Sequence, residues 1–100
     1  MDPIMAQLRA RYISSFPEKH ALLLAAWEAI PAHPGAKIDL RVLCHKLAGS
    51  APMYECIELG NSARAVCDAL DQNAAMEAVG LRIQELLQQL TRHPGELPTP

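Results

Sequence analysis

Apolar residues recur every three or four positions along most of this chain of 100 residues, which is the spacing of one face of an α-helix. Five segments show this period, and none shows the strict alternation of apolar and polar residues that indicates a half-buried strand. Prolines and glycines lie between several of the segments, where a helix cannot readily continue. The pattern predicts an all-α chain, and its length suits one domain.

The first helix is expected from Pro3 to Phe16, and the second begins at Pro17, because a proline in a first turn loses no hydrogen bond. The prolines and glycine of IPAHPGAK end the second helix. The residues expected to face inward on the first helix are Ile4, Leu8, Tyr12 and Phe16. Those on the second are Leu23, Ala26, Trp27 and Ile30.

The third helix is expected to start near Ile38 to Asp39, with Asp39 as its N-cap or first-turn acid, and to kink or end at Pro52. Its apolar face is Leu40, Leu43, Cys44, Leu47 and Ala51. The fourth helix is expected from Glu55 to Leu70. Its apolar face is Leu59, Ala63, Val66, Cys67 and Leu70.

The fifth helix is expected from Ala74 to Arg92, with Asn73 as a possible N-cap. Its apolar face is Met76, Val79, Ile83, Leu86, Leu87 and Leu90. Four long amphipathic helices with short connections predict an antiparallel four-helix bundle, and the first helix would be a short accessory helix across one end. Residues 1–92 would form the domain, and residues 93–100 a flexible tail or the start of a linker.

Composition excludes several classes of function. The net charge of −2 does not match the basic surface of a nucleic-acid-binding protein. No apolar run approaches the roughly 20 residues of a membrane span, and the N-terminus lacks the features of a signal peptide. Three cysteines without a secretion signal argue against a disulfide framework, so we expect a cytoplasmic protein.

The segment LCHKLAGSA, residues 43–51, places a histidine and a glycine in the third helix. His45 lies about 160–200° around the helix from Leu43 and Leu47, so it points away from the core. Gly49 lies one turn further on the same face and costs about 1 kcal/mol relative to alanine. An exposed neutral imidazole is a competent nucleophile. Arg41 and Lys46 could bring positive charge towards a phosphoryl group on it.

The segment HKLAGSA resembles the signature of histidine-containing phosphotransfer (HPt) domains, commonly His-x-Leu-(Lys/Ala)-Gly-Ser-(Ala/Ser). The resemblance extends to Leu59, Ala63 and Val66, to RARYISSFPEKHALLLAAWEAI and to IDLRVLCHKLAGSA. It implies a four-helix bundle that carries a phosphoryl group between aspartates of response-regulator receiver domains in a bacterial two-component phosphorelay. A hybrid histidine kinase would be a further partner.

The resemblance implies that His45 accepts the phosphoryl group, with Lys46, Arg41 and Ser50 in the phosphate environment. Partner docking would fall to Arg41, Ala48 and Gly49. The chain would need no cofactor or metal of its own, because the partner receiver supplies Mg²⁺ and no Gly-rich ATP-binding loop is present. It would act as a monomeric carrier rather than as an enzyme.

The sequence departs from the family at four positions near the end of the third helix. Ala48 stands where many members have lysine, as in a subgroup with a basic residue directly after the histidine. Glu55 stands where a turn glycine is usual, and Pro52 and Met53 are also atypical. These departures bear on the local geometry after the histidine and not on the histidine itself.

Three other functions compete with this interpretation. A metal site could use Cys44, His45, Cys56 and Cys67, but their spacing contains no CxxC or HxxxH pair, and the cysteines suit a core. A helical module could dock a receiver or another signalling protein without accepting phosphate. A histidine-kinase dimerisation bundle normally has an acidic residue after its histidine, where this chain has Lys46.

Overall fold

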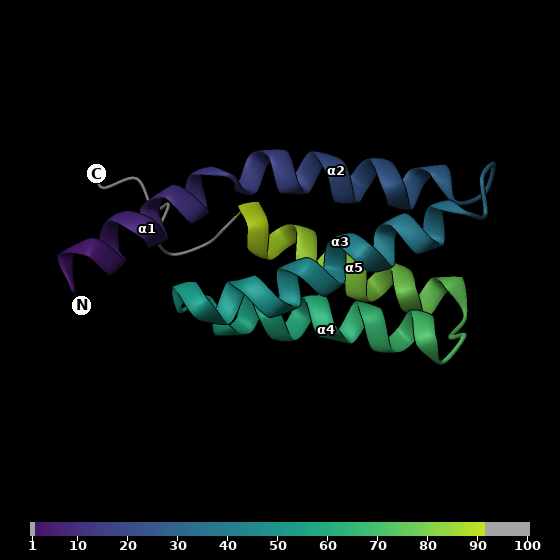
Figure 1. Ribbon diagram of the computed structural model, residues 1–100. Helices are drawn as coiled ribbons and strands as arrows, with labels where there is room; N and C mark the ends of the chain where they lie inside the picture. The colour runs from purple at the N-terminus through teal and green to yellow at the C-terminus, as the bar shows by residue number, and fades with distance from the viewer. Residues whose placement is uncertain (1, 92–100) are drawn as a thin grey trace.

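A computed structural model describes residues 2–91, and this part of the chain is helical with no strand. The elements are α1 (Pro3–Ser14), α2 (Phe16–Ala29), α3 (Ala36–Ser50), a 3₁₀ helix η1 (Ala51–Tyr54), α4 (Ile57–Asp71) and α5 (Met76–Thr91) (Figure 1). The predicted all-α class is confirmed. None of these helices is long and apolar enough to cross a membrane.

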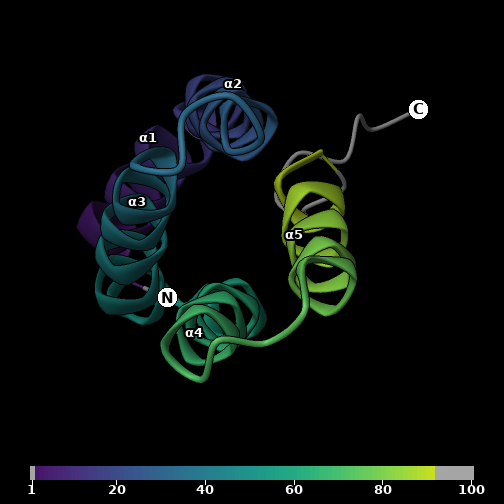
Figure 2. The same cartoon turned by 90° about the vertical axis from the view of Figure 1, so that its right-hand side faces the viewer.

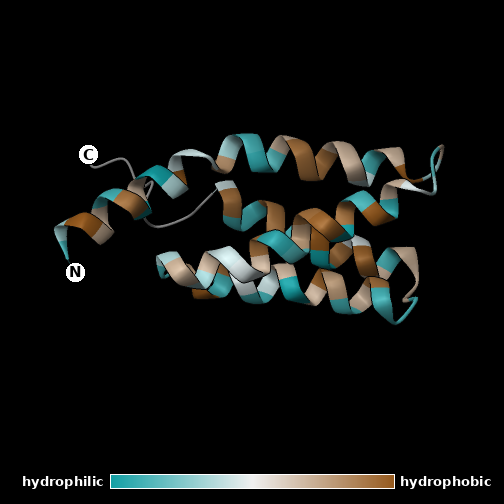
Figure 3. Cartoon of the chain, in the orientation of Figure 1, coloured by the Kyte–Doolittle hydropathy of each residue, from teal (hydrophilic) through white to brown (hydrophobic). Residues whose placement is uncertain are grey.

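Helices α2, α3, α4 and α5 surround one apolar core (Figure 2). Each packs against two others: α3 against α2 and α4, and α5 against α4 and α2. The colouring in Figure 3 shows that every helix mixes apolar and polar residues, as expected when one side is buried. The largest fully buried side chains are Phe16, Leu23, Leu40, Leu59, Ile83, Leu86 and Leu90. All of these were predicted to face inward.

Helix α1 begins at an N-cap formed by Asp2, whose Oδ1 accepts a hydrogen bond of 3.0 Å from the backbone N–H of Ile4. It contacts η1 at one end of the bundle, but it runs on from α2 and projects past that end instead of lying across it (Figure 1). Ile4 is therefore 67% exposed and Leu8 is also exposed, which corrects their predicted inward position. Only the last turns of α1 reach the core.

The end of α3 explains how the chain accommodates Pro52 and Glu55. Helix α3 ends at Ser50, and Pro52 lies in the first turn of η1, where a missing N–H is tolerated. Glu55 then adopts the left-handed conformation (φ 61°, ψ 26°), and the N–H of Cys56 donates to the carbonyl of Ala51 at 2.9 Å. This is a Schellman ending, which usually has glycine at the left-handed position. In this chain Glu55 adopts the left-handed conformation that glycine usually provides.

Several predicted helix boundaries differ from the structure. The first helix ends at Ser14 instead of Phe16, the second begins at Phe16 instead of Pro17, and the fourth begins at Ile57 instead of Glu55. Helix α3 starts at Ala36, so Asp39 is an acid of the first turn and Gly35 occupies the N-cap position. Asn73 does not cap α5: it has φ 54° and follows the end of α4, where the N–H of Ala74 donates to the carbonyl of Ala69 at 2.9 Å. Asparagine tolerates this left-handed position better than most residues. Arg92 and the predicted tail lie outside the described residues.

The start of α5 also corrects one core position. Because α5 begins at Met76, that side chain lies at the edge of the bundle and is exposed. The rest of the α5 face is buried or half-buried, as predicted. Gly80 lies close to the core side of α5, and a Cβ there would be 3.1 Å from Cζ2 of Trp27 on α2. The glycine allows the indole to approach this helix.

Candidate functional site

His45 lies on the outer side of α3 and is exposed to solvent. Leu40, Cys44 and Leu47 anchor the opposite side of the helix in the core. The predicted outward direction of His45 is confirmed. Helix α3 packs against both α2 and α4, so the helix that carries His45 is supported on two sides.

Gly49 leaves open space one turn beyond His45. A Cβ built at Gly49 would meet no heavy atom within 4 Å, apart from its own helix backbone and chain neighbours. Gly60 is different, because a Cβ there would lie 3.0 Å from Cδ and Cγ of Pro52. A contact within the described residues therefore explains why position 60 is glycine, whereas no such contact explains the glycine at position 49.

Two apolar side chains on the same face of α3 were not singled out by the sequence reasoning. Ile38 is 69% exposed and Val42 is 44% exposed. At about 100° per residue, they lie within about 20° and 60° of the direction of His45. Their positions, seven and three residues before the histidine, already place them on its side of the helix. Together with His45 and Gly49 they form the α3 outer face, which is partly apolar and has the imidazole near its centre.

Arg41 also lies near this face, but its guanidinium is held by α4. Its Nε donates to Oδ1 of Asp71 at 2.6 Å, and its Nη2 donates to Oδ2 at 3.0 Å. This two-point hydrogen bonding lowers the pKa of Asp71 and raises that of Arg41. The structure thus directs the expected phosphate-binding cation sideways, towards the C-terminal end of α4.

The Ser50 hydroxyl contacts Tyr12 of α1. Its Oγ lies 2.6 Å from Oη of Tyr12, at the junction of α1 with the bundle. Ser50 is also about 140° around α3 from His45, because five residues separate them. The hydroxyl joins α3 to α1, and its expected place in the phosphate environment stays a prediction.

Ala48, which was expected to contribute to partner docking, is largely buried. It is only 7% exposed and belongs to the core cluster. Its backbone lies close to α4, since its carbonyl oxygen would be 3.5 Å from a Cβ at Gly60. Ala48 lies at the contact between α3 and α4, and its expected role in partner docking stays a prediction.

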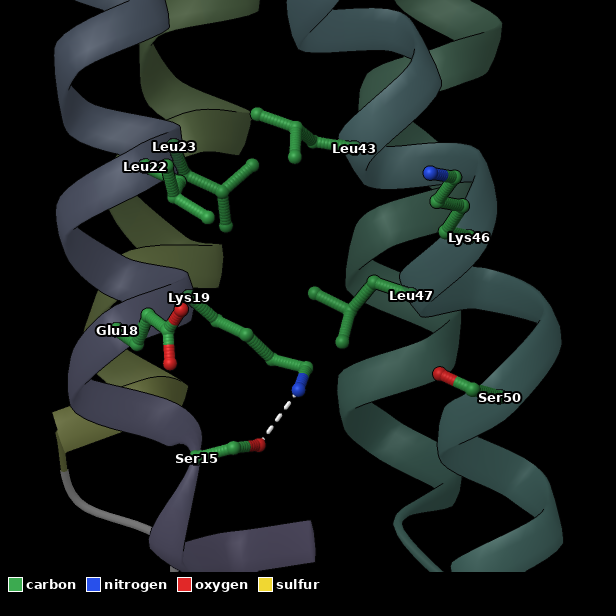
Figure 4. Close-up of a pocket in the computed structure, with 9 residues that line it drawn as sticks. All are labelled: Ser15, Glu18, Lys19, Leu22, Leu23, Leu43, Lys46, Leu47 and Ser50. Carbon is green, nitrogen blue, oxygen red and sulfur yellow. Dashed lines mark hydrogen bonds between the residues drawn. The ribbon is translucent and has the colours of Figure 1, made fainter.

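Lys46 is exposed and lies about 100° around α3 from His45. Its side chain lines a cavity between α2 and α3, together with Lys19 and Leu43 (Figure 4). The cation that follows the histidine is therefore on the α2 side of α3, whereas Arg41 is drawn to the α4 side.

The three cysteines are buried free thiols in the core, as the pattern predicted for Cys44 and Cys67. Burial raises the pKa of the Cys44 thiol to about 12 and also raises those of Cys56 and Cys67. Such thiols stay protonated, whereas metal ligation requires the thiolate. Among residues 2–91, no group of three or more His, Cys, Asp or Glu side chains is placed to hold a metal ion.

Comparisons with protein-family models, curated proteins and solved structures give no match for this chain.

Proposed function

We propose that this chain is an HPt domain, an intermediate of a two-component phosphorelay in which His45 carries the phosphoryl group. The short connections between consecutive helices favour the antiparallel arrangement of that family. The proposal rests on the resemblance of HKLAGSA to the family signature and on the placement of His45 at the outer side of a helix whose other side is buried.

The observation that carries the proposal is the open space at Gly49. Glycine in the interior of a helix costs about 1 kcal/mol relative to alanine. No contact within the described residues requires this glycine, in contrast to Gly60. A requirement from outside the chain explains it: a receiver must approach the imidazole closely, and a side chain one turn away would obstruct that approach.

The proposed chemistry is a transfer between two side chains. A nitrogen of the neutral His45 imidazole attacks the phosphorus of an aspartyl phosphate on the receiver, a P–N bond forms, and the P–O bond to the aspartate breaks. The aspartate leaves as a carboxylate, and the Mg²⁺ bound by the receiver stabilises the charge on the transferring group. The reverse reaction passes the group to a second receiver. The chain needs no nucleotide site for this exchange.

The α3 outer face would be the docking surface. Ile38 and Val42 provide exposed apolar area next to His45, which is the kind of area that protein partners bury. Arg41, held beside this face by Asp71, would contribute to its rim. One histidine per bundle is sufficient for transfer, so we propose a monomer acting on receiver domains and a hybrid histidine kinase in the cytoplasm.

The test is transfer of labelled phosphate. A receiver carrying a radiolabelled aspartyl phosphate is mixed with wild-type protein, with His45→Gln and with His33→Gln, whose histidine lies on the exposed connection between α2 and α3. We expect acid-labile label on the wild type and on His33→Gln, and none on His45→Gln. Label on His45→Gln would reject His45 as the carrier. If a panel of receivers binds the wild type without labelling it, the chain is a docking module.

A further inference from the structure

A cavity of about 250 Å³ lies between α2 and α3 (Figure 4). Leu43 and Leu47 line it, and they are about 160–200° around α3 from His45. The two ends of the cavity differ in chemistry. Ser15, Lys19 and Ser50 line one end, and Leu22, Leu23 and Leu43 line the other. The cavity therefore combines a lysine ammonium with an apolar wall, and a few polar groups in an apolar lining typify small-molecule sites.

The polar end is organised around the Lys19 ammonium. Its Nζ donates to Oγ of Ser15 at 2.5 Å and lies 4.8 Å from the centre of the Tyr12 ring. No carboxylate forms an ion pair with Lys19 among residues 2–91. Partial burial lowers the pKa of this lysine, because the charged form loses solvation. An ammonium has three donors, and the hydrogen bond to Ser15 uses one of them.

The charges around the cavity also favour an anion. Lys19 and Lys46 both line it, and Glu18 is the one carboxylate among its lining residues. Glu18 is exposed, whereas Lys19 is half-buried, so the lysine is the less screened of the two. The cavity is smaller than the roughly 300–1,000 Å³ of drug-sized sites, which restricts the ligand to a short chain.

We propose that the cavity between α2 and α3 binds a short-chain aliphatic carboxylate. The carboxylate is bound by Lys19 at the serine-lined end, and the aliphatic tail lies against Leu22 and Leu43. Both parts contribute: the anion neutralises a half-buried cation, and the tail covers apolar side chains, of which Leu22 is half exposed. The site is independent of His45 and stands whether or not the chain carries phosphate.

Hexanoate is the probe, and its binding is followed by ¹H–¹⁵N NMR on the full chain. We expect saturable shifts for the backbone amides of Ser15, Lys19 and Leu43. Acetate lacks the tail and hexanol lacks the charge, so each should bind at least about tenfold more weakly. Hexylammonium has the opposite charge and should not bind.

Lys19→Met keeps the stem of the side chain and removes the charge, and we expect it to weaken hexanoate binding at least about tenfold. Lys37→Met is the control, because Lys37 is exposed at the start of α3 and does not line the cavity. Leu22→Gln, at a half-exposed position, should also weaken hexanoate without affecting acetate. Equal binding by wild type and Lys19→Met, or equal binding of hexanol and hexanoate, would overturn the proposal.

Discussion

The Tyr12 hydroxyl lies 2.6 Å from the Ser50 hydroxyl and joins α1 to the last residue of α3, five positions after His45. The Tyr12 ring also stacks on Tyr54 of η1, with centroids 4.3 Å apart, and meets Phe16 edge to face at 5.6 Å. Burial raises the pKa of Tyr12, so its hydroxyl stays protonated at neutral pH. Through this residue the accessory helix holds the end of the helix that carries the proposed site.

Removing this hydrogen bond should destabilise the fold modestly. We expect Tyr12→Phe and Ser50→Ala each to lower the free energy of unfolding by about 1 kcal/mol, measured by urea denaturation. The double variant should lose little more than either single variant, because both changes remove the same contact. Fully additive losses would show that the hydroxyls act separately.

Gly49→Ala should stabilise the protein and Gly60→Ala should destabilise it. The new methyl group at Gly49 meets open space, so the gain in helix propensity of about 1 kcal/mol is retained. The methyl group at Gly60 meets the Pro52 ring at 3.0 Å, so η1 has to give by a few tenths of an ångström. Thermal and urea unfolding of the two variants give the comparison directly. A loss of stability in Gly49→Ala would contradict the open surface.

A large side chain at position 49 should impair phosphotransfer, although a methyl group there is expected to stabilise the fold. Gly49→Leu places a large side chain one turn from His45, and we expect the rate of labelling by a phosphorylated receiver to fall at least about tenfold. Circular dichroism should show a folded helical protein, since the side chain points to solvent. Normal transfer by Gly49→Leu would show that a receiver does not need the open space at Gly49, which is the observation that carries the proposed function.

The buried thiols should resist alkylation. With the pKa of Cys44 raised to about 12 and those of Cys56 and Cys67 also raised, the reactive thiolate is scarce at pH 8. Iodoacetamide should modify the folded protein far more slowly than the urea-unfolded protein, as measured by mass spectrometry. Rapid modification of one cysteine under native conditions would show that its part of the core opens readily.

Periodicity predicted the buried faces of α2 to α5 well, because each of these helices has neighbours on two sides. It misplaced Ile4 and Leu8, because a repeat of apolar residues does not say whether a partner element reaches that far along a helix. Asn73 was misjudged for a related reason: asparagine suits both an N-cap and a left-handed helix ending. Only the observed backbone of this turn distinguishes the two.

The placement of the candidate site residues was predicted in part. The direction of His45 followed from its angle to Leu43 and Leu47, which the sequence contains. The neighbours of Arg41 and Ser50 did not, because Asp71 and Tyr12 are 30 and 38 residues away in sequence. Such contacts depend on how whole helices pack. The sequence spacing that places residues on one face of α3 gives no information on what lies beside that face.

The ion pair between Arg41 and Asp71 leads to the last prediction. Arg41 lies within about 40° of His45 on α3, one turn earlier, but its guanidinium donates two hydrogen bonds to Asp71. Asp71→Asn removes the anion and frees the guanidinium to approach phosphorylated His45. A nearby cation stabilises the negatively charged phosphoryl group. We therefore expect the half-life of the phosphoryl group on His45 to increase by up to about fivefold in Asp71→Asn, measured from loss of radiolabel.

Asp68→Asn is the matched control, because Asp68 is exposed on the same helix and changes the net charge equally without bonding Arg41. The ion pair should also survive mild acid, because the hydrogen bond from Arg41 lowers the pKa of Asp71 in the folded protein. The contribution of the pair to stability is present above the ordinary pKa of 3.8, and it is lost only as the pH falls through the lower pKa of the folded state. In Arg41→Gln, the change Asp71→Asn should no longer affect the half-life. Equal half-lives for Asp71→Asn and Asp68→Asn would show that overall charge, and not the release of Arg41, governs the phosphoryl group.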